Sequence, residues 1–293
     1  MISIVIPAYN EEGVIVETIE RCRKVLKEIG DEHSEVIIVD DCSQDRTREL
    51  AEAAGARVIS HPHNAGYGRS LKDGITAAKN DTIAITDADG TYPLESIPAL
   101  FEMYKKNFDM VVGARQGKNY DESIKKKLLR LILKNLVEYT AGRKIDDINS
   151  GLRIFSKKTI TGYFDTLCDT FSFTTSATLA YMMTGKFVKY MPITYQKRVG
   201  KTKVKLFKDT MRTMQYIVEA ILYYNPIKIF IALTVMVLAF GFFNFLLALI
   251  FHLNMGFWLG IGCILLSIFI FVLGLLAVLL KQILMTNRFQ NHR

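Results

Sequence analysis

Two long apolar runs close to the C-terminus limit what this chain can fold into more than any other feature. Residues 229–253 contain one titratable side chain, His252, and residues 256–280 contain no charge. A helix of this length extends roughly 37 Å, which exceeds the roughly 30 Å hydrocarbon core of a bilayer. The few residues between the runs allow only a tight turn. We therefore expect a two-helix transmembrane anchor over residues 226–293; the alternative is a buried helical hairpin in a soluble core.

Basic residues flank the pair of runs and are absent from the turn between them. The positive-inside rule then places the short C-terminal tail and everything before the first run in the cytoplasm. This predicts a multi-pass membrane protein with both termini cytoplasmic. The flanking residues are Lys197, Arg198, Lys201, Lys203, Lys205, Lys208, Arg212 and Lys228 before the runs, and Lys281, Arg288 and Arg293 after them.

The stretch that leads into the first run has apolar residues at helical spacing over residues 205–224. We expect an amphipathic helix at the membrane interface, assigned to residues 205–225. Packing of the same face against a globular domain is the alternative. The apolar positions are Leu206, Phe207, Met211, Met214, Ile217, Val218, Ile221 and Leu222.

Residues 1–204 alternate short β-rich runs with amphipathic stretches. Such alternation predicts an α/β domain with a mostly parallel, Rossmann-like sheet. The cysteines form no CxxC pair, which favours a reducing compartment. We expect strands at 2–6, 35–39, 56–60, 82–86 and 109–113, and helices near 12–29, 44–54, 67–79, 94–106 and 123–141.

Acidic residues follow two of the expected strands, at the edge where α/β sheets bind ligands. Asp87 and Asp89 lie two residues apart after 82–86, and such a pair can share a hard cation with the phosphates of a substrate. Asp40 and Asp41 follow 35–39, where acids commonly bind ribose hydroxyls or base edges. The alternative for this second segment is helix capping by Ser43, with Asp45 in the first turn of the next helix.

Basic residues exceed acidic ones by eight, which indicates an anionic partner. Nine Lys and Arg accompany one acid in residues 186–212, and seven accompany two acids in residues 115–134. Contact with anionic headgroups is the simplest explanation for Lys205, Lys208 and Arg212. It explains Arg115 less well, because Arg115 follows an expected buried strand.

Several motifs occur in an order and spacing that resemble a known enzyme family. VIPAYNEE, IIVDDCSQDRT, NAGYGRSLKDG and DADGTYP are similar to the inverting family-2 glycosyltransferases with a GT-A fold. DDINSGLRIFSK and QKRVGKTK resemble the polyprenyl-phosphate branch of that family, including dolichyl-phosphate mannose and glucose synthases. The resemblance covers roughly residues 1–205 and implies transfer of a hexose, with inversion, from UDP-glucose or GDP-mannose to a polyprenyl or dolichyl phosphate. It further implies Mg²⁺ or Mn²⁺ as cofactor, a membrane as partner and no nucleic acid.

The resemblance also implies roles for matching residues. Asp87 and Asp89 would hold the metal together with Thr91, although Thr91 stands where many relatives have Gln. Arg115, with Arg130 and Lys201, would bind the acceptor phosphate, and Arg198 would act on the departing diphosphate. The residues implied to bind the nucleotide sugar are Pro7, Tyr9, Glu11, Asp40, Asp41, Asn64, Ala88 and Lys203.

The acceptor chemistry decides whether a general base is needed. A sugar hydroxyl needs one, but a phosphate monoester is largely dianionic at neutral pH. No histidine lies in the DADG, GAR or RVGK motifs. We therefore expect direct displacement by the lipid phosphate. Asp146 and Asp147 are the remaining base candidates, and their alternative role is loop capping and orientation of Arg153.

Other functions fit the sequence less well. A processive polysaccharide synthase typically carries QxxRW, whereas the single Trp258 lies in an apolar run. A nucleotidyltransferase and a glycosyltransferase with a sugar-hydroxyl acceptor are further alternatives. A non-catalytic scaffold would not need Asp87, Asp89, Asp41 and Arg198. A homo-oligomer is expected to shield Asn244 from lipid.

Overall fold

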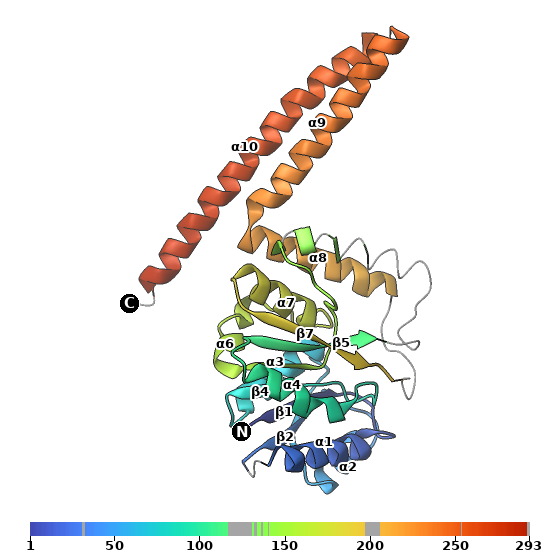
Figure 1. Cartoon of the computed structure of the whole chain (residues 1–293), viewed down its shortest axis with the longest axis vertical. Coiled ribbons are helices and arrows are strands. Elements are labelled where there is room, and N and C mark those ends of the chain that lie inside the picture. Colours follow the sequence, from blue (N-terminus) through green and yellow to red (C-terminus); the bar gives the residue numbers. More distant parts are fainter. Residues whose placement is uncertain are drawn as a thin grey trace. The chain divides into compact units, whose positions relative to one another are not determined.

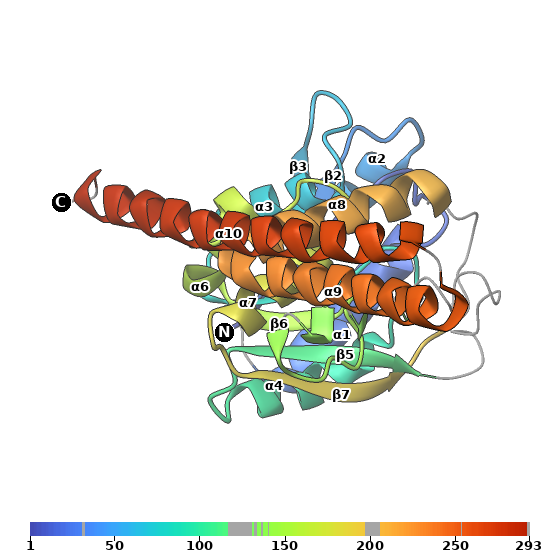
Figure 2. The ribbon, with the colours of Figure 1, turned by 90° about the horizontal axis from the view of Figure 1, so that it is seen from above.

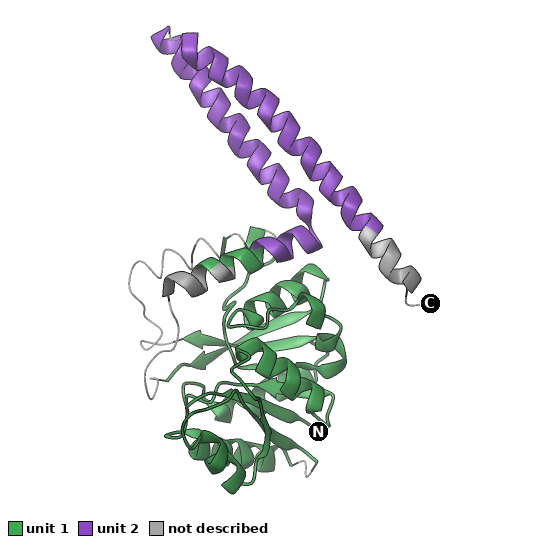
Figure 3. Cartoon of the chain, turned by 180° about the vertical axis from the view of Figure 1, so that it is seen from behind, with its two compact units in different colours: residues 1–217 green, residues 218–293 purple. Residues whose placement is uncertain are grey.

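The computed structural model describes residues 1–30, 33–116, 131, 134–135, 137–139, 141–196, 206–252 and 254–291, without the side chains of 206–210, 212–213 and 284–291. The chain forms two compact units, Met1–Ile217 and Val218–Arg293 (Figure 3). The boundary between them lies inside helix α8 (Leu206–Tyr224).

In the described part of the first unit, seven strands form one sheet in the order β3-β2-β1-β4-β6-β5-β7 (Figure 1). Strand β6 is antiparallel to both neighbours, and the remaining pairs are parallel. The mostly parallel α/β fold expected from the sequence is confirmed, with β6 and β7 added to the expected strands. The strands are β1 (Ser3–Ala8), β2 (Glu35–Asp40), β3 (Arg57–Ser60), β4 (Thr82–Ile85), β5 (Met110–Gln116), β6 (Arg153–Ser156) and β7 (Val188–Thr194).

The antiparallel strand determines what lies at the functional edge. The parallel strands all end at one edge of the sheet. Since β6 runs the other way, it begins at that edge, and the segment before it (145–152) lies there too. Asp40 at the end of β2, Asp41 after it, the acids after β4, Arg115 near the end of β5 and this segment therefore share one edge.

Helices cover both faces of the sheet. Helices α1 and α4 share one apolar core with β1, in which Ile4, Ile19 and Leu100 are fully buried. Helix α3 packs on the opposite face, against β1 and β2. Gly74 permits this approach, because a Cβ there would lie 2.4 Å from Val5 and 2.8 Å from Val39. The helices are α1 (Ile15–Ile29), α2 (Thr47–Ala53), α3 (Tyr67–Ala77), η1 (Leu94–Ser96), α4 (Ile97–Tyr104), α6 (Lys157–Thr161), η3 (Phe164–Thr166) and α7 (Phe173–Met183).

The second unit is a helical hairpin. Helices α9 (Pro226–Phe251) and α10 (Asn254–Asn291) run side by side (Figures 1 and 2). Glycines bring them close: a Cβ at Gly241 would lie 2.6 Å from Cys263, and one at Gly274 2.6 Å from Phe230. Most large apolar side chains of both helices point outward, as a lipid-facing pair requires. Both helices are long and apolar enough to cross a membrane.

Helix α8 agrees with the expected range of 205–225. Ile217 and Ile221 are buried, whereas Met211 and Leu222 are exposed. The expected position of this helix at a membrane interface stays a prediction.

Candidate functional site

The first carboxylate of the DADG segment, Asp87, lies directly beyond β4. The Tyr67 hydroxyl, at the start of α3, donates a hydrogen bond of 2.8 Å to Asp87. Burial and the charge of Asp87 raise the pKa of Tyr67, so the phenol stays a neutral donor. The carboxylate also lies against Gly151, where a Cβ would be 2.9 Å from Oδ1.

The second carboxylate, Asp89, is buried and is held by its own loop. The Thr91 backbone N–H and hydroxyl donate to Asp89 Oδ1 at 3.1 and 2.6 Å. Thr91 itself is fully buried. In this structure Thr91 orients Asp89, and its implied role as a metal ligand stays a prediction. The implied nucleotide contact Ala88, between the two acids, is buried, and its carbonyl accepts a hydrogen bond from the Thr18 hydroxyl at 3.3 Å.

Arg115, at the end of β5, is paired with Asp147 from the segment before β6. The Arg115 Nε donates to Asp147 Oδ2 at 2.7 Å and Nη2 donates to Oδ1 at 2.8 Å. The Arg115 backbone N–H also donates to Oδ2, at 3.2 Å. Burial alone would raise the pKa of Asp147, but the hydrogen bonds and charge of Arg115 hold that pKa below its usual range. Asp147 is therefore a carboxylate in the folded protein.

A series of contacts through Tyr195, Tyr92 and Gly151 joins Arg115 to Asp87. The Arg115 guanidinium lies 5.4 Å from the ring centroid of Tyr195, and Tyr195 packs edge-on against Tyr92 at 5.4 Å. The Tyr92 hydroxyl accepts a hydrogen bond of 2.6 Å from the Gly151 N–H. Because a Cβ at Gly151 would lie only 2.9 Å from the Asp87 carboxylate, Asp87 and Arg115 belong to one continuous cluster.

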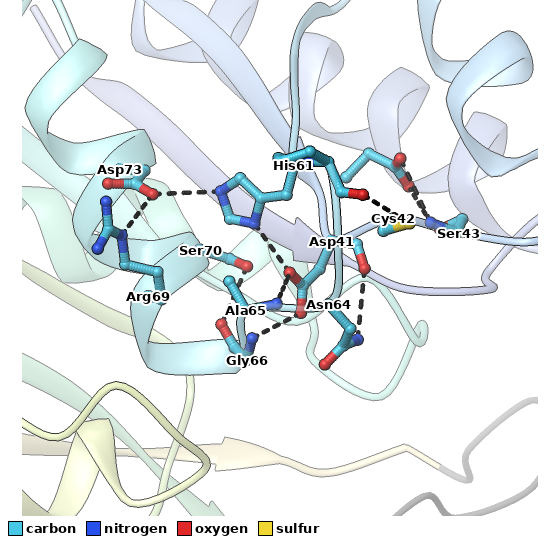
Figure 4. A network of polar contacts seen from close by, with 12 residues as sticks. Asp41, Cys42, Ser43, His61, Asn64, Ala65, Gly66, Arg69, Ser70 and Asp73 are labelled. Carbon is cyan, nitrogen blue, oxygen red and sulfur yellow. Dashed lines mark hydrogen bonds and ion pairs between the residues drawn. The ribbon is translucent and has the colours of Figure 1, made fainter.

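The acids after β2 are held differently (Figure 4). The Ala65 and Gly66 backbone N–H groups donate to Asp41 at 2.7 and 2.9 Å, and His61 Nδ1 lies 2.8 Å from Asp41 Oδ1. On its other side His61 Nε2 lies 3.2 Å from Asp73. Asp41 thus fixes the loop between β3 and α3.

Asp40 is also buried, and its carboxylate accepts a long hydrogen bond from the Ser43 N–H. Ser43 does not cap a helix, because its hydroxyl accepts the Asn10 N–H at 2.9 Å and α2 begins only at Thr47. Asp45 accepts the Thr47 N–H instead. The expected capping of this helix by Ser43 is therefore wrong.

The other implied nucleotide residues surround this loop. Pro7 is buried in β1, and Tyr9 and Glu11 are half-buried just beyond it. The Glu11 N–H donates to the Thr47 hydroxyl at 2.7 Å, which ties the β1 loop to α2. Asn64 is exposed, and its side-chain amide donates to the Asp41 carbonyl at 3.3 Å.

The hydrogen bonds that orient Arg153 are made with groups other than Asp146 and Asp147, and Asp147 acts on Arg153 only through its charge. Arg153 is fully buried and donates to the carbonyls of Ser150 and Ile148, at 2.7 and 2.8 Å, and to the Thr178 hydroxyl at 2.7 Å. Burial lowers the pKa of Arg153. Asp146 is exposed. The capping role expected for Asp147 is confirmed, because Asp147 accepts the Asn149 N–H at 3.1 Å.

The basic residues Arg130, Arg198, Lys201 and Lys203 lie outside the described residues. The described chain before the last three ends at Gln196, whose N–H donates to the Thr91 carbonyl at 2.9 Å.

Four contributors to this cluster were not expected from the sequence: Tyr67, Tyr92, Gly151 and Tyr195. Three of them lie within quoted motifs: Tyr67 in NAGYGRSLKDG, Tyr92 in DADGTYP and Gly151 in DDINSGLRIFSK. Tyr195 directly precedes QKRVGKTK. Their position within or next to a motif was the one sequence signal that could have indicated a role at the site. Their contacts could not be predicted, because these contacts join distant parts of the chain.

Comparisons with known proteins agree on one family. The family model described as glycosyl transferase family 2 matches residues 3–163. The chain is 30% identical to the low-salt glycan biosynthesis hexosyltransferase Agl6 of Haloferax volcanii, over 73% of this chain and 52% of that protein. It is 28% identical to a dolichyl-phosphate hexose transferase of the same organism, over 70% of this chain and 87% of that protein.

A relative from Edwardsiella ictaluri, undecaprenyl-phosphate 4-deoxy-4-formamido-L-arabinose transferase, is 32% identical over 54% of this chain and 50% of its own length. The chain thus spans about half the length of this protein and of Agl6. Among solved structures, glucosyl-3-phosphoglycerate synthase of Mycobacterium tuberculosis with Mn²⁺ and UDP has a TM-score of 0.59 and 20% identity, over 75% of this chain and 79% of that one. This likeness shows a shared fold.

Proposed function

Since the chain belongs to glycosyl transferase family 2, we propose that it transfers a sugar from a nucleoside diphosphate sugar to the phosphate of a membrane polyprenyl phosphate. The family and the fold expected from the sequence are confirmed. The transfer itself, its donor and its acceptor are the proposal.

The observation that carries the proposal is the continuous cluster from Asp87 to Arg115. Its carboxylates suit a metal-bound diphosphate, and its guanidinium suits a phosphate. Gly151, Tyr92 and Tyr195 lie between them through the contacts described above. A donor phosphate and an acceptor phosphate would therefore bind at the same edge of the sheet, as a transfer between them requires.

The acidic residues fit a divalent cation that shares its ligands with a substrate. The described residues contain no group of three His, Cys, Asp or Glu that could hold a metal ion by themselves. Mg²⁺ is usually held by one or two carboxylates plus substrate phosphates. Asp87 and Asp89 would hold Mg²⁺ or Mn²⁺ in this way, and the bound cation would neutralise charge on the leaving diphosphate.

The protein's own residues then have simple tasks. Arg115 orients the acceptor phosphate so that one of its oxygens attacks the anomeric carbon. A new carbon–oxygen bond forms as the bond from that carbon to the β-phosphate breaks, and the nucleoside diphosphate leaves with the bonding electrons. Attack from the face opposite the leaving group inverts the anomeric centre. The acceptor dianion needs no proton removed, so no protein base is required. Arg198, Lys201 and Lys203 are proposed to stabilise the departing diphosphate.

The membrane helices agree with a lipid acceptor. Polyprenyl phosphate stays in the bilayer, so an anchored enzyme meets it at a raised local concentration. We propose that α9 and α10 span the membrane with both termini cytoplasmic and that α8 lies at the interface. Two relatives are named for transfer to dolichyl or undecaprenyl phosphate, one for a hexose and one for a modified arabinose. The acceptor chemistry is thus common to both names, and we propose UDP-glucose or GDP-mannose as donor.

The test uses the purified full chain in detergent with Mn²⁺ or Mg²⁺. Undecaprenyl and dolichyl phosphate are offered with radiolabelled UDP-glucose, GDP-mannose and UDP-linked amino and uronic sugars. We expect one donor to yield an acid-labile lipid-linked sugar, and we expect excess EDTA to abolish the product. Label found only in free sugar or in a soluble glycoside would contradict the lipid-phosphate acceptor. Donor binding without turnover under all conditions would indicate a scaffold.

A further inference from the structure

The carboxylate of Asp147 is saturated with hydrogen bonds. Its Oδ2 accepts from Arg115 Nε at 2.7 Å and from the Arg115 backbone N–H at 3.2 Å. Its Oδ1 accepts from Arg115 Nη2 at 2.8 Å and from the Asn149 N–H at 3.1 Å. A carboxylate offers about four lone-pair positions, so these four donors occupy its capacity.

From this geometry we infer that Asp147 is the positioning residue of the acceptor-binding Arg115 and does not serve as a general base. The inference rests on the proposed function. The sequence alone allows three roles for Asp147: general base, loop cap or partner of Arg153. The inference assigns it one task, to position Arg115.

A general base must present a lone pair to the proton it removes. Asp147 would have to break one of its four hydrogen bonds to do so. Its side chain is only 3% exposed, which leaves little room for a substrate hydroxyl to approach. The lowered pKa of Asp147 agrees, because a carboxylate that holds its proton weakly is a poor base.

Positioning follows from where the donors lie on Arg115. Asp147 binds the edge of the guanidinium formed by Nε and Nη2, and it also binds the backbone N–H of the same residue. The side chain is therefore fixed relative to its own main chain. The Tyr195 ring, 5.4 Å from the guanidinium carbon, restricts the plane of the group. A flexible arginine loses rotamer entropy when it binds phosphate, and this arrangement removes much of that cost beforehand.

Hydrogen bonds from neighbouring residues also hold the main chain of the segment that carries Asp147. Buried Arg153 donates to the carbonyls of Ile148 and Ser150, the first and third residues after Asp147. The Ser150 hydroxyl donates to the Gly113 carbonyl at 2.6 Å, two residues before Arg115 on β5. The segments that carry the two partners of the ion pair are thus also joined by the hydrogen bond from the Ser150 hydroxyl to the Gly113 carbonyl.

The principal test compares Asp147→Asn with Asp146→Asn in the full chain. Asp146 is the adjacent, exposed acid, so its variant removes the same charge from the same segment. Initial rates are measured with the active donor over a range of undecaprenyl phosphate concentrations and of pH. For Asp147→Asn we expect KM for undecaprenyl phosphate to rise roughly 10- to 100-fold, because a charge-assisted pair is lost. We expect a smaller change in kcat, an unchanged acid limb of the pH profile, and little change for Asp146→Asn.

A double-mutant cycle separates positioning from base catalysis. If Asp147 acts through Arg115, adding Asp147→Asn to Arg115→Gln should cost little beyond Arg115→Gln alone. A base would cost the same factor in both backgrounds. That result, or loss of kcat with restoration by added acetate, would overturn the inference. An equal KM rise in Asp146→Asn would overturn it too, because the effect would then come from net charge.

UDP affinity and the midpoint of thermal unfolding verify that each variant is folded. If Asp147→Asn fails this check, Asp147→Glu keeps the charge and displaces the carboxylate. We expect Asp147→Glu to raise the acceptor KM with the pH profile unchanged, and an unchanged KM would contradict positioning. A wild-type chain that transfers nothing to either undecaprenyl or dolichyl phosphate would overturn the proposed function and this inference together. An active wild type with a base-like Asp147→Asn would overturn the inference alone.

Discussion

Two acidic segments lie at the same edge of the sheet, and the structure holds them in opposite ways. After β2, Asp41 accepts two backbone N–H groups and contacts His61. After β4, Asp87 accepts a tyrosine hydroxyl, and Asp89 accepts a threonine hydroxyl together with one backbone N–H. In sequence both are simply pairs of aspartates after an apolar strand.

This difference suggests two roles: Asp41 stabilises the loop between β3 and α3, and Asp87 and Asp89 are available to bind a ligand. Backbone N–H groups of a neighbouring loop cannot leave Asp41 without unfolding that loop. Hydroxyl groups rotate, so Asp87 and Asp89 can exchange their hydroxyl partners for the proposed cation. We therefore expect substitutions after β2 to change stability and substitutions after β4 to change activity.

The largest effect is expected for Asp89→Asn. Loss of one of the two carboxylates proposed to hold the cation should reduce sugar transfer by roughly 10²- to 10³-fold, the range seen when one preorganised electrostatic contact is removed. Transfer is measured as lipid-linked radiolabel, and the midpoint of thermal unfolding should stay close to wild type. A comparable loss of stability would remove the contrast between the two segments.

Asp41→Asn comes next and should act on stability. An amide cannot accept as many hydrogen bonds as a carboxylate, so one of the buried N–H groups loses its partner at a cost of about 2 kcal/mol. The midpoint of thermal unfolding should fall by several degrees. Exposed Asp165 provides the control, since Asp165→Asn removes an equal charge. An unchanged midpoint with strongly weakened UDP binding would show that Asp41 serves the nucleotide directly.

Gly151→Ala should reduce transfer roughly tenfold. Its new methyl group would lie 2.9 Å from the Asp87 carboxylate, which must then rotate away from its position. A tenfold loss corresponds to about 1.4 kcal/mol. Gly13→Ala is the matched control, because a Cβ at Gly13 meets no atom within 4 Å. Equal rates for both variants would show that the position of Asp87 is not critical.

Tyr67→Phe should have the smallest effect. It removes one hydrogen bond to Asp87, worth about 1 kcal/mol, and should reduce transfer about fivefold with an increased Mn²⁺ requirement. Tyr163→Phe removes a hydroxyl that pairs with Thr184 elsewhere and should not change the Mn²⁺ requirement. A larger loss than for Gly151→Ala would mean that Tyr67 contacts the substrate.

Much of the fold could be predicted because its signals are local. β-rich runs of five residues predicted β1 to β5, and amphipathic spacing predicted α1 to α4 and α8. Strands β6 and β7 were not expected, since Arg153 and Lys189 interrupt their apolar pattern. Arg153 is tolerated in a buried strand only because three oxygens from other positions surround it.

The position of several candidate residues at one sheet edge was predictable from the sequence, and their hydrogen-bond partners were less so. The sequence placed Asp40, Asp41, Asp87, Asp89 and Arg115 at one sheet edge, because parallel strands must end together. It could not pair Asp147 with Arg115, 32 residues away, or join Tyr67 to Asp87. A carboxylate next to several basic residues in sequence has many possible partners.

The order of motifs and the length of the apolar runs by themselves determined the family, the α/β class and two helices able to cross a membrane. The family follows from the order of motifs, the α/β class from local periodicity, and the membrane-spanning helices from the number of consecutive apolar residues. All three signals can be read along the chain without knowledge of distant contacts. Tertiary structure alone decided that Asp41 binds the backbone N–H groups of another loop and that Asp87 binds the hydroxyl of a tyrosine on α3. That choice depends on donors brought together from distant strands, and only the packed sheet fixes their distances.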